Sequence, residues 1–325
     1  MRIALIATLC LFAAFTIASA AKAAGLQPIA VPGEDGATSL EGAAWYPCAA
    51  PPDVVKLRRI EVPGVKDCPI EGEGLPLVVI SHGARGWFGG HHDTAAALAD
   101  AGYVVAAITH PDGPGRRWQT ARPAAIKRLI DYMLSAWPQR ERLDGDRIGF
   151  FGFSRGGYTG LVLIGGKPDF RRIAQHCRKV PNEPLCRFSK GPESTSGSAS
   201  GARKRIFTQD PRITAAVIAA PLGLVFSPEG LQDVQVPVQL WRPEHDALAT
   251  HPYNAEAVYQ GLPVKPEYHV VAGAGHFAIL APCTPPQAQA VPMICEDAPG
   301  FDRVAFHREF NADILAFFEK HLSRP

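Results

Sequence analysis

The sequence predicts an α/β fold in which a mostly parallel central sheet carries helices on both faces. Short apolar runs alternate with helix-length segments along most of the 325 residues, as expected where strands are joined by crossover helices. The run that ends at Phe153 fits a strand buried on both faces. This run, Arg147 to Phe153, leads into the glycine-rich turn Gly152-Phe153-Ser154-Arg155-Gly156 and a small-residue helix over 156–164.

The elements before this turn follow in order. Residues 24–42 are small and polar, and we expect an N-terminal arm there. Two short segments, 43–47 and 57–62, are each expected to form an edge strand. Strands are then predicted over 75–81 and 103–108, and helices over 91–101 and 120–137. The last helix carries its apolar side chains on one face, namely Ile126, Leu129, Ile130, Met133 and Leu134.

After the turn the alternation breaks and then resumes. Residues 167–211 are basic and include the low-complexity run Gly191 to Gly201, which indicates a cap-like insertion, part of it mobile. Further elements are predicted as strands over 213–220, 236–241 and 267–272, and helices over 252–260 and 303–321. We find no repeat and no linker between two cores, so residues 24–325 are expected to form a single domain.

Composition agrees with a chain that folds around a large core. Hydrophobic residues make up 46% of the sequence and charged residues 20%. The formal net charge is only +2, so no bulk electrostatic attraction for nucleic acid is expected.

Residues 1–23 have the pattern of a secretory signal peptide. Arg2 gives a short positive start, and the apolar run from Ile3 to Ala18 is too short for a comfortable membrane span. Small residues allow cleavage after Ala20 or after Ala23, and an uncleaved anchor helix is the alternative. No later stretch is apolar enough to cross a bilayer, so we expect an exported chain, periplasmic or secreted, without a stable span.

Six cysteines remain after the leader, and an even number in an exported chain favours disulfides. Their positions form three pairs that are close in sequence, so local pairing is the simplest of the fifteen possibilities. Metal binding is the alternative, but the cysteines show no spacing typical of ligands. The predicted pairs are Cys48–Cys68, Cys177–Cys186 and Cys283–Cys295.

The glycine-rich turn has the spacing of a nucleophile elbow, in which a strand turns sharply into a helix and presents a serine. Residues without side chains two positions before and after the serine let the backbone fold tightly and a substrate approach. The alternative is an ordinary strand-to-helix turn. The strand before the turn and the helix after it favour Ser154 as a nucleophile.

A serine nucleophile needs a base that accepts its proton and a carboxylate that orients the base. In this arrangement the chain order is serine, acid, histidine. Asp246 lies just beyond the predicted strand 236–241, and His276 just beyond the strand 267–272. Both therefore fall at carboxyl ends of strands, at the same edge of the sheet as Ser154.

Nearby residues are rivals for both roles. Glu244 comes earlier in the turn than Asp246, and Asp233 precedes the strand. His269 lies inside a strand pattern and is expected to be packed, whereas His276 follows three small residues that suit a loop bending into a site. The remaining rival histidines are His245 and His251.

The negative charge that develops on the substrate oxygen needs two N–H donors. We expect the backbone N–H of Arg155 as the first. The second is expected from the loop that follows strand 75–81, with Ala84 preferred and Arg85 next. His82 is expected to make a structural hydrogen bond beneath this loop.

No metal or cofactor is predicted. His91, His92 and Asp93 suggest a metal site, but adjacent histidines on a helix rarely point at one ion, so solvent or loop contacts are expected. Four arginines would suit an anionic substrate, but a solvated surface role is expected for them: Arg85, Arg116, Arg117 and Arg155.

With these residues in place, the chain resembles the α/β-hydrolase superfamily. Within it, the chain is similar to the secreted predicted dienelactone hydrolases, which are themselves similar to platelet-activating-factor acetylhydrolases. The elbow is specific to the superfamily. The segment with His276, together with the cysteine-bearing tail that follows it, is specific to the subgroup. The resembling segments cover most of the mature chain: Val79-Ile80-Ser81-His82-Gly83, residues 152–157, residues 272–277, and the tail from Cys283 through Cys295 to residues 301–303.

The resemblance implies an α/β-hydrolase fold and a serine hydrolase of carboxylic esters or lactones that needs no cofactor. It assigns the roles of nucleophile, base and acid to Ser154, His276 and Asp246, and that of second oxyanion donor to Ala84. Two departures stand out. Dienelactone hydrolases proper use a cysteine nucleophile, and the acetylhydrolases place their acid closer to the serine in sequence than Asp246 is here.

We therefore expect an exported serine hydrolase that cleaves a small-molecule ester or lactone through an acyl-enzyme intermediate. An amidase or peptidase on the same triad is the alternative among enzymes. A non-catalytic ligand-binding protein with a hydrolase fold is the alternative from another class.

Overall fold

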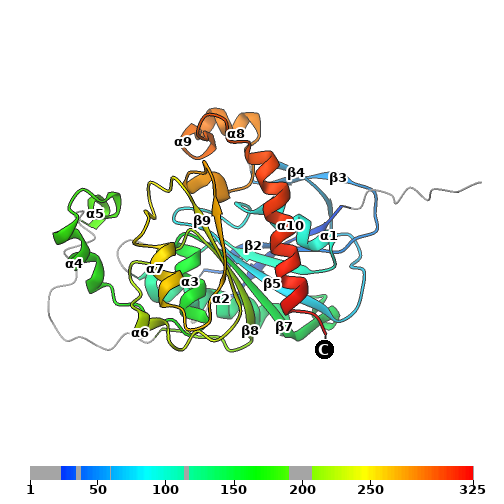
Figure 1. The fold of residues 1–325 in the computed structure, drawn as a ribbon. Helices are drawn as coiled ribbons and strands as arrows, with labels where there is room; N and C mark the ends of the chain where they lie inside the picture. Colours follow the sequence, from blue (N-terminus) through cyan, green and yellow to red (C-terminus); the bar gives the residue numbers. More distant parts are fainter. Residues whose placement is uncertain (1–22, 34–37, 59, 113–116, 190–206, 325) are drawn as a thin grey trace, which may run out of the picture.

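In the part of the chain that the structure describes, ten strands form one sheet (Figure 1). The computed structural model describes residues 23–33, 38–58, 60–112, 117–189 and 207–324. The strands are β1 Gly25–Val31, β2 Leu40–Tyr46, β3 Asp53–Leu57, β4 Ile60–Lys66, β5 Leu75–Ser81, β6 Val104–Ile108, β7 Leu143–Phe153, β8 Ile213–Ala219, β9 Val238–Pro243 and β10 Glu267–Val271. Across the sheet they lie in the order β10-β9-β8-β7-β5-β6-β2-β1-β4-β3.

Strands β5 to β10 form the parallel part of the sheet, which confirms the predicted fold class. The strand order reverses at β5, because the chain continues to β6 on one side and then crosses to β7 on the other. Ligands of open parallel sheets bind at such a reversal, beyond the carboxyl ends of the strands. The fold therefore favours a site at the ends of β5 and β7.

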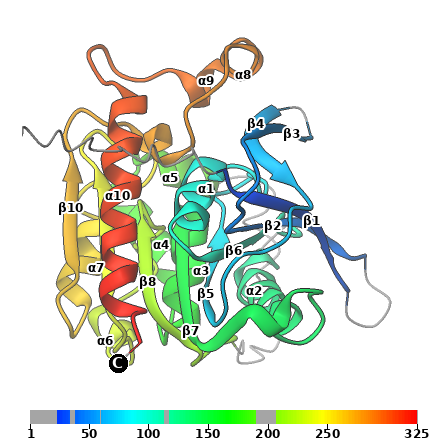
Figure 2. The same ribbon diagram turned by 90° about the vertical axis from the view of Figure 1, so that its right-hand side faces the viewer.

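Helices cover both faces of the parallel strands, as predicted. The described helices are α1 His92–Asp100, α2 Trp118–Ser135, α3 Arg155–Leu163, α4 Arg171–Lys179, α5 Pro184–Ser189, α6 Pro228–Leu231, α7 Ala255–Gly261, α8 Pro285–Ala290, α9 Pro292–Cys295 and α10 Arg303–His321. Helices α1 and α10 pack together on one face, as Figures 1 and 2 show. Helices α2 and α3 lie on the other.

Each face of the sheet has its own apolar core. The predicted apolar face of α2, including Ile126 and Leu129, packs in the cluster that contains Phe150. Phe151 belongs to the opposite cluster, with Phe310 of α10. Adjacent residues of β7 thus enter different cores, because side chains alternate across a strand.

The N-terminal segments differ from the sequence-based expectation. Residues 24–42, expected to be an arm, include β1, which pairs antiparallel with the whole of β2. The segment 43–47 is not an edge strand, because β6 pairs with the other side of β2. The expected strand over 57–62 is split between two strands of a hairpin. Leu57 ends β3, residues 60–62 begin β4, and Arg58, which follows β3, has a φ of 51°. Strand β1 was missed because it contains Gly25 and Pro28, which disfavour strands, and the hairpin was missed because its turn has no Gly, Asn or Pro.

The described part of the insertion contains α4 and α5, which protrude from the body (Figure 1). It contacts the loops that follow β8 and β9. Arg172 Nε donates to the carbonyl oxygen of Leu224 at 2.9 Å, and the hydroxyl of Thr250 donates to the carboxylate of Glu183. The low-complexity run 191–201 and residues 1–22 of the predicted leader lie outside the described residues.

The sulfur atoms of all three predicted cysteine pairs lie at disulfide distance. The S–S distances are 1.90 Å for Cys48–Cys68, 1.90 Å for Cys177–Cys186 and 2.02 Å for Cys283–Cys295. Among the helices that the structure describes, none combines the length and apolar character needed to cross a bilayer.

Candidate active site

Ser154 occupies the sharp turn between β7 and α3. Its φ of 56° and ψ of −114° lie in a region that residues with a side chain rarely adopt. The turn is held on both sides, because the Ser154 N–H donates to the carbonyl of Ala219 at 2.9 Å and its carbonyl accepts from Leu222 at 3.2 Å. The backbone thus presents the half-buried serine beyond the end of the strand.

The two flanking glycines are sterically required, as the spacing of the turn predicts. A Cβ on Gly152 would lie 2.4 Å from the carbonyl oxygen of Gly156. A Cβ on Gly156 would lie 1.8 Å from the carbonyl oxygen of Ser81, at the end of β5. The elbow therefore closes tightly on itself and against the neighbouring strand.

Ser154, His276 and Asp246 form one hydrogen-bonded chain. The Nε2 atom of His276 lies 3.1 Å from the Ser154 hydroxyl oxygen, and its Nδ1 lies 2.7 Å from a carboxylate oxygen of Asp246. An ionised carboxylate only accepts hydrogen bonds, so Nδ1 carries a proton and Nε2 is left to accept from the serine. This is the orientation that a general base needs.

The loops that carry the acid and the histidine are tied to each other. Asp246 follows β9 and accepts N–H hydrogen bonds from Leu248 at 2.8 Å and Ala249 at 2.6 Å. His276 begins the 3₁₀ helix His276–Ile279 after β10. The His245 N–H donates to the carbonyl of Ala274 at 2.9 Å. Both side chains are buried, so the pair is shielded from water.

The rival residues lie elsewhere or have structural contacts. The carboxylate of Glu244 accepts from the Gly273 N–H at 2.8 Å, and Asp233 pairs with Lys167. The ring of His269 stacks on Trp241 with centroids 4.1 Å apart, as expected for a packed side chain. The rings of His245 and His251 belong to exposed residues.

The two expected oxyanion donors lie on either side of the serine. Arg155 is the first residue of α3, so its N–H belongs to the positive end of the helix. Ala84 lies in a tight turn closed by the Gly86 N–H on the Gly83 carbonyl at 3.2 Å, and Arg85 has a φ of 58°. A Cβ on Gly83 would lie 3.4 Å from the Ser154 Cβ, so this turn lies beside the serine.

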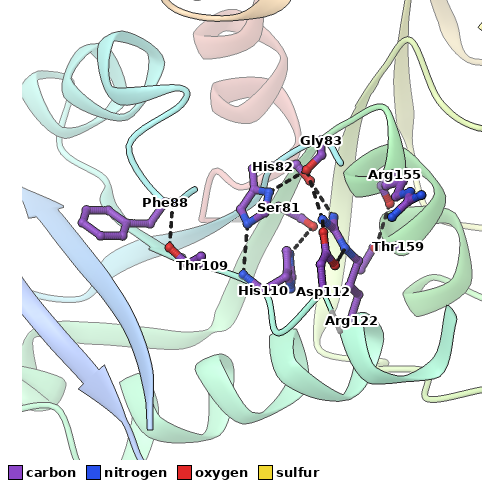
Figure 3. Close-up of polar contacts among 10 residues, drawn as sticks. All are labelled: Ser81, His82, Gly83, Phe88, Thr109, His110, Asp112, Arg122, Arg155 and Thr159. Carbon is purple, nitrogen blue, oxygen red and sulfur yellow. Dashed lines mark hydrogen bonds and ion pairs between the residues drawn. The ribbon is translucent and has the colours of Figure 1, made fainter. Parts of the chain in front are cut away.

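His82 makes the structural hydrogen bonds predicted for it (Figure 3). Its Nδ1 donates to the Gly83 carbonyl at 2.7 Å, and its Nε2 accepts from the His110 N–H at 3.0 Å. The Nε2 of His110 lies 2.7 Å from the hydroxyl of Ser81. These contacts join the loops that follow β5 and β6. Burial, with the Arg122 charge, lowers the pKa of His82 to about 3 and that of His110 well below its usual range.

Arg122 of α2 lies beneath the same turn, and Figure 3 shows its guanidinium between the turn and Asp112. It donates to the carbonyls of His82 and Gly83 and pairs with the Asp112 carboxylate. Burial opposes ionisation of Asp112, but Arg122 holds the pKa of that carboxyl below its usual range. Sequence reasoning missed this pair. The position of Arg122 in the sequence could have indicated its burial, because it lies four residues before Ile126, on the apolar face of the helix.

Of the two kinds of contact expected for His91, contact with solvent is wrong because the residue is buried, whereas a contact with another segment is present at the Ile279 backbone. The His91 ring packs edge-on against Phe151 and Phe153, with centroids 5.0 and 5.6 Å away. Burial lowers the pKa of His91 to about 4, although Asp93 acts in the opposite direction. The His91 ring thus fills space between α1 and the end of β7. Its burial was not evident from the sequence, because the next two residues, His92 and Asp93, are polar.

Asp93 has protein partners of its own. Its carboxylate lies 2.6 Å from Nδ1 of His307 and accepts from Asn311 at 3.1 Å. Among the residues that the structure describes, no group of three or more His, Cys, Asp or Glu side chains is placed to hold a metal ion.

The arginines considered for an anionic substrate are not equivalent. The guanidinium of Arg155 lies over the Trp118 ring, 4.4 Å from its centroid. Arg85 and Arg117 are exposed, as expected of a solvated surface, and Arg116 lies outside the described residues.

Three features define an α/β-hydrolase fold here: the reversal in strand order at β5, the strained turn at Ser154, and the loops after β9 and β10 that carry Asp246 and His276. Among solved structures, the chain is similar to a ferulic acid esterase from Streptomyces cinnamoneus, with 17% identity, a TM-score of 0.62 and 93% of each chain covered. No protein-family model matches the sequence, and no curated protein does. The structural likeness establishes the fold, and the chemistry rests on the side chains.

Proposed function

We propose that this chain is an exported serine hydrolase that cleaves carboxylic esters or lactones of small molecules. The observation that carries the proposal is the hydrogen-bonded chain Ser154–His276–Asp246 beyond the carboxyl ends of β7, β10 and β9. The esterase among the structural neighbours supports an ester as the substrate class. The predicted dienelactone hydrolase subgroup remains part of the proposal.

The geometry supports an acyl-enzyme route. His276 Nε2 accepts the proton of Ser154 as the hydroxyl oxygen attacks the ester carbonyl carbon. The N–H groups of Arg155 and Ala84 stabilise the negative oxygen of the tetrahedral intermediate. His276 then gives the proton to the departing alcohol, and a water molecule activated by the same nitrogen releases the acid. Asp246 holds the imidazole in the required tautomer throughout.

Export belongs to the same proposal. The leader pattern of residues 1–23 motivates it, and three cysteine pairs at disulfide distance are compatible with an oxidising compartment. We propose one hydrolase domain over residues 24–325.

Replacement of the nucleophile tests the proposal. Ser154→Ala should lower kcat for p-nitrophenyl acetate by about 10³-fold or more. Ser135→Ala on the exposed end of α2 is the matched control and should keep the wild-type rate. An unchanged rate in Ser154→Ala rejects the proposed nucleophile. A panel of matched esters, lactones and amides, with a ferulate ester included, separates an esterase from an amidase.

A fluorophosphonate probe separates the enzyme from a binding protein that only shares the fold. The probe should label the wild type at Ser154 and leave Ser154→Ala unlabelled. A wild-type chain that resists the probe would favour the non-catalytic alternative.

A further inference from the structure

We propose that Arg122 is a positioning residue of the oxyanion hole, which acts by fixing the peptide between Gly83 and Ala84. The inference rests on the proposed hydrolase function and on Ala84 as the second oxyanion donor. Arg122 lies on α2 and is far from the elbow in sequence, so neither the elbow motif nor its flanking segments assign it this task.

The first step is where the guanidinium donates. The Arg122 side chain is fully buried. Its Nη1 donates to the His82 carbonyl at 2.6 Å and its Nη2 donates to the Gly83 carbonyl at 3.0 Å. One side chain therefore holds two consecutive carbonyl groups of the turn that carries Ala84.

The second step is what this does to the Ala84 N–H. The Gly83 carbonyl and the Ala84 N–H belong to one planar trans peptide, so they point in opposite directions. The Gly83 oxygen accepts from Arg122, from His82 Nδ1 at 2.7 Å and from the Gly86 N–H at 3.2 Å. With three donors on the oxygen side, the direction of the N–H is set as well.

The third step concerns how strongly the Ala84 N–H donates. A hydrogen bond from a charged guanidinium to a carbonyl polarises the whole peptide, which makes its N–H a better donor to a developing oxyanion. Asp112 keeps the guanidinium plane in place, because Nε donates to its carboxylate at 2.6 Å and Nη2 contacts the second oxygen. A lysine ammonium has no such fork and cannot reproduce all of these contacts.

Packing alone does not require an arginine here. An apolar side chain would fill this face of α2 without the cost of burying a charge. It would, however, leave the His82 carbonyl without the Arg122 donor and the Gly83 oxygen with two of its three donors, so the Gly83–Ala84 peptide would be held less firmly. The charge is placed where it controls a functional peptide, which favours a positioning role over a purely structural one.

The test compares two buried arginines that have similar contacts. Arg303 pairs with Asp297 through Nε at 2.9 Å and Nη2 at 2.8 Å, and its Nη1 donates to the Ile294 carbonyl at 2.9 Å. It holds the α9 segment and takes no part in the proposed site. Arg122→Lys and Arg303→Lys therefore disturb comparable networks, and only the first should affect catalysis.

For p-nitrophenyl acetate, Arg122→Lys should lower kcat by about 10²-fold with little change in KM, because oxyanion donors act mainly in the transition state. Arg303→Lys should keep kcat within about twofold. A matched thionoester adds a specific measure, since N–H donors stabilise a negative oxygen better than a negative sulfur. The preference for the oxygen ester should shrink in Arg122→Lys alone.

A folded Arg122→Lys with the kcat of Arg303→Lys overturns the inference, and so does an equal loss on both esters. If Arg122→Lys does not fold, Asp112→Asn is measured in the same way. It should lower kcat by about tenfold and reduce the oxygen preference, and an unchanged preference again overturns the inference. Wild-type protein that neither hydrolyses the ester nor reacts with the fluorophosphonate overturns the hydrolase proposal itself, and this inference with it.

Discussion

Lowering the pH should destabilise this protein through histidines that are buried in the neutral form. Burial lowers the pKa of His82 to about 3 and of His91 to about 4, from an ordinary value of 6.5. His110 shifts in the same direction. The unfolded chain binds more protons than the folded one between these pKa values, so stability is complete above the unfolded pKa and falls as the pH decreases.

The size of the effect follows from proton linkage. At pH 5 an unfolded imidazole is almost fully protonated while the folded His91 is still mostly neutral, which costs about 2 kcal/mol relative to pH 8. His82 costs about the same, and His110 adds to both. Together these losses are a large fraction of the roughly 5–15 kcal/mol that stabilises a typical protein. Acid sensitivity should therefore begin well above the pH at which carboxylates titrate.

The measurement is urea unfolding at pH 8 and pH 5, followed by tryptophan fluorescence, for wild type and His91→Leu. The His91 ring packs against Phe151 and Phe153, so leucine removes the titration and keeps the apolar packing. The loss of unfolding free energy between the two pH values should be smaller by about 2 kcal/mol in His91→Leu. His245→Leu, at a ring that is 63% exposed, is the control. An identical pH dependence in His91→Leu and wild type would refute the reasoning.

Two further changes test the elbow and the acid. Gly156→Ala should destabilise the fold by at least about 3 kcal/mol, because the new Cβ meets backbone atoms of Ser81. Gly145→Ala, whose Cβ would be 3.7 Å from its nearest neighbour, should leave the melting temperature nearly unchanged, and equal melting temperatures for the two variants would contradict this account. Asp246→Asn should lower kcat by about 10⁴-fold at similar KM, because the amide no longer enforces the His276 tautomer. A loss of less than tenfold, with an unaltered circular dichroism spectrum, would assign the acid role elsewhere.

Sequence patterns predicted the parallel strands well because most of them, such as β5 and β6, are largely apolar runs bounded by a helix or a turn. The closing helix from Arg303 to His321 was predicted with its observed limits, since its apolar side chains recur at the helical period. The geometric partnership of Ser154, Asp246 and His276 was also predictable. Strand ends of a parallel sheet meet at one edge, so position in the chain implies proximity in space.

Contacts between distant segments that share no such pattern were not predictable. The hairpin at Arg58 lacks the usual turn residues. Strand β1 contains Gly25 and Pro28, which disfavour strands, and it is stabilised by pairing with β2. The packing of His91 against Phe151 and the contacts of Arg122 with the turn after β5 depend on tertiary placement. A buried polar residue is defined by its surroundings, which its own sequence neighbourhood does not reveal.

The pairing of β5 with β7 has a consequence for how such a protein diversifies. Ser81 of β5 and Gly152 of β7 are paired in the sheet. The turn with Ala84 and the elbow with Ser154 therefore begin from neighbouring strands about 5 Å apart. Their mutual spacing is a property of the main chain. Segments outside this pair of strands, such as α4 and α5 between α3 and β8, can vary in length and composition. Changes in the peripheral loops can therefore fit a different substrate, while the distance between the serine hydroxyl and the oxyanion donors stays constant.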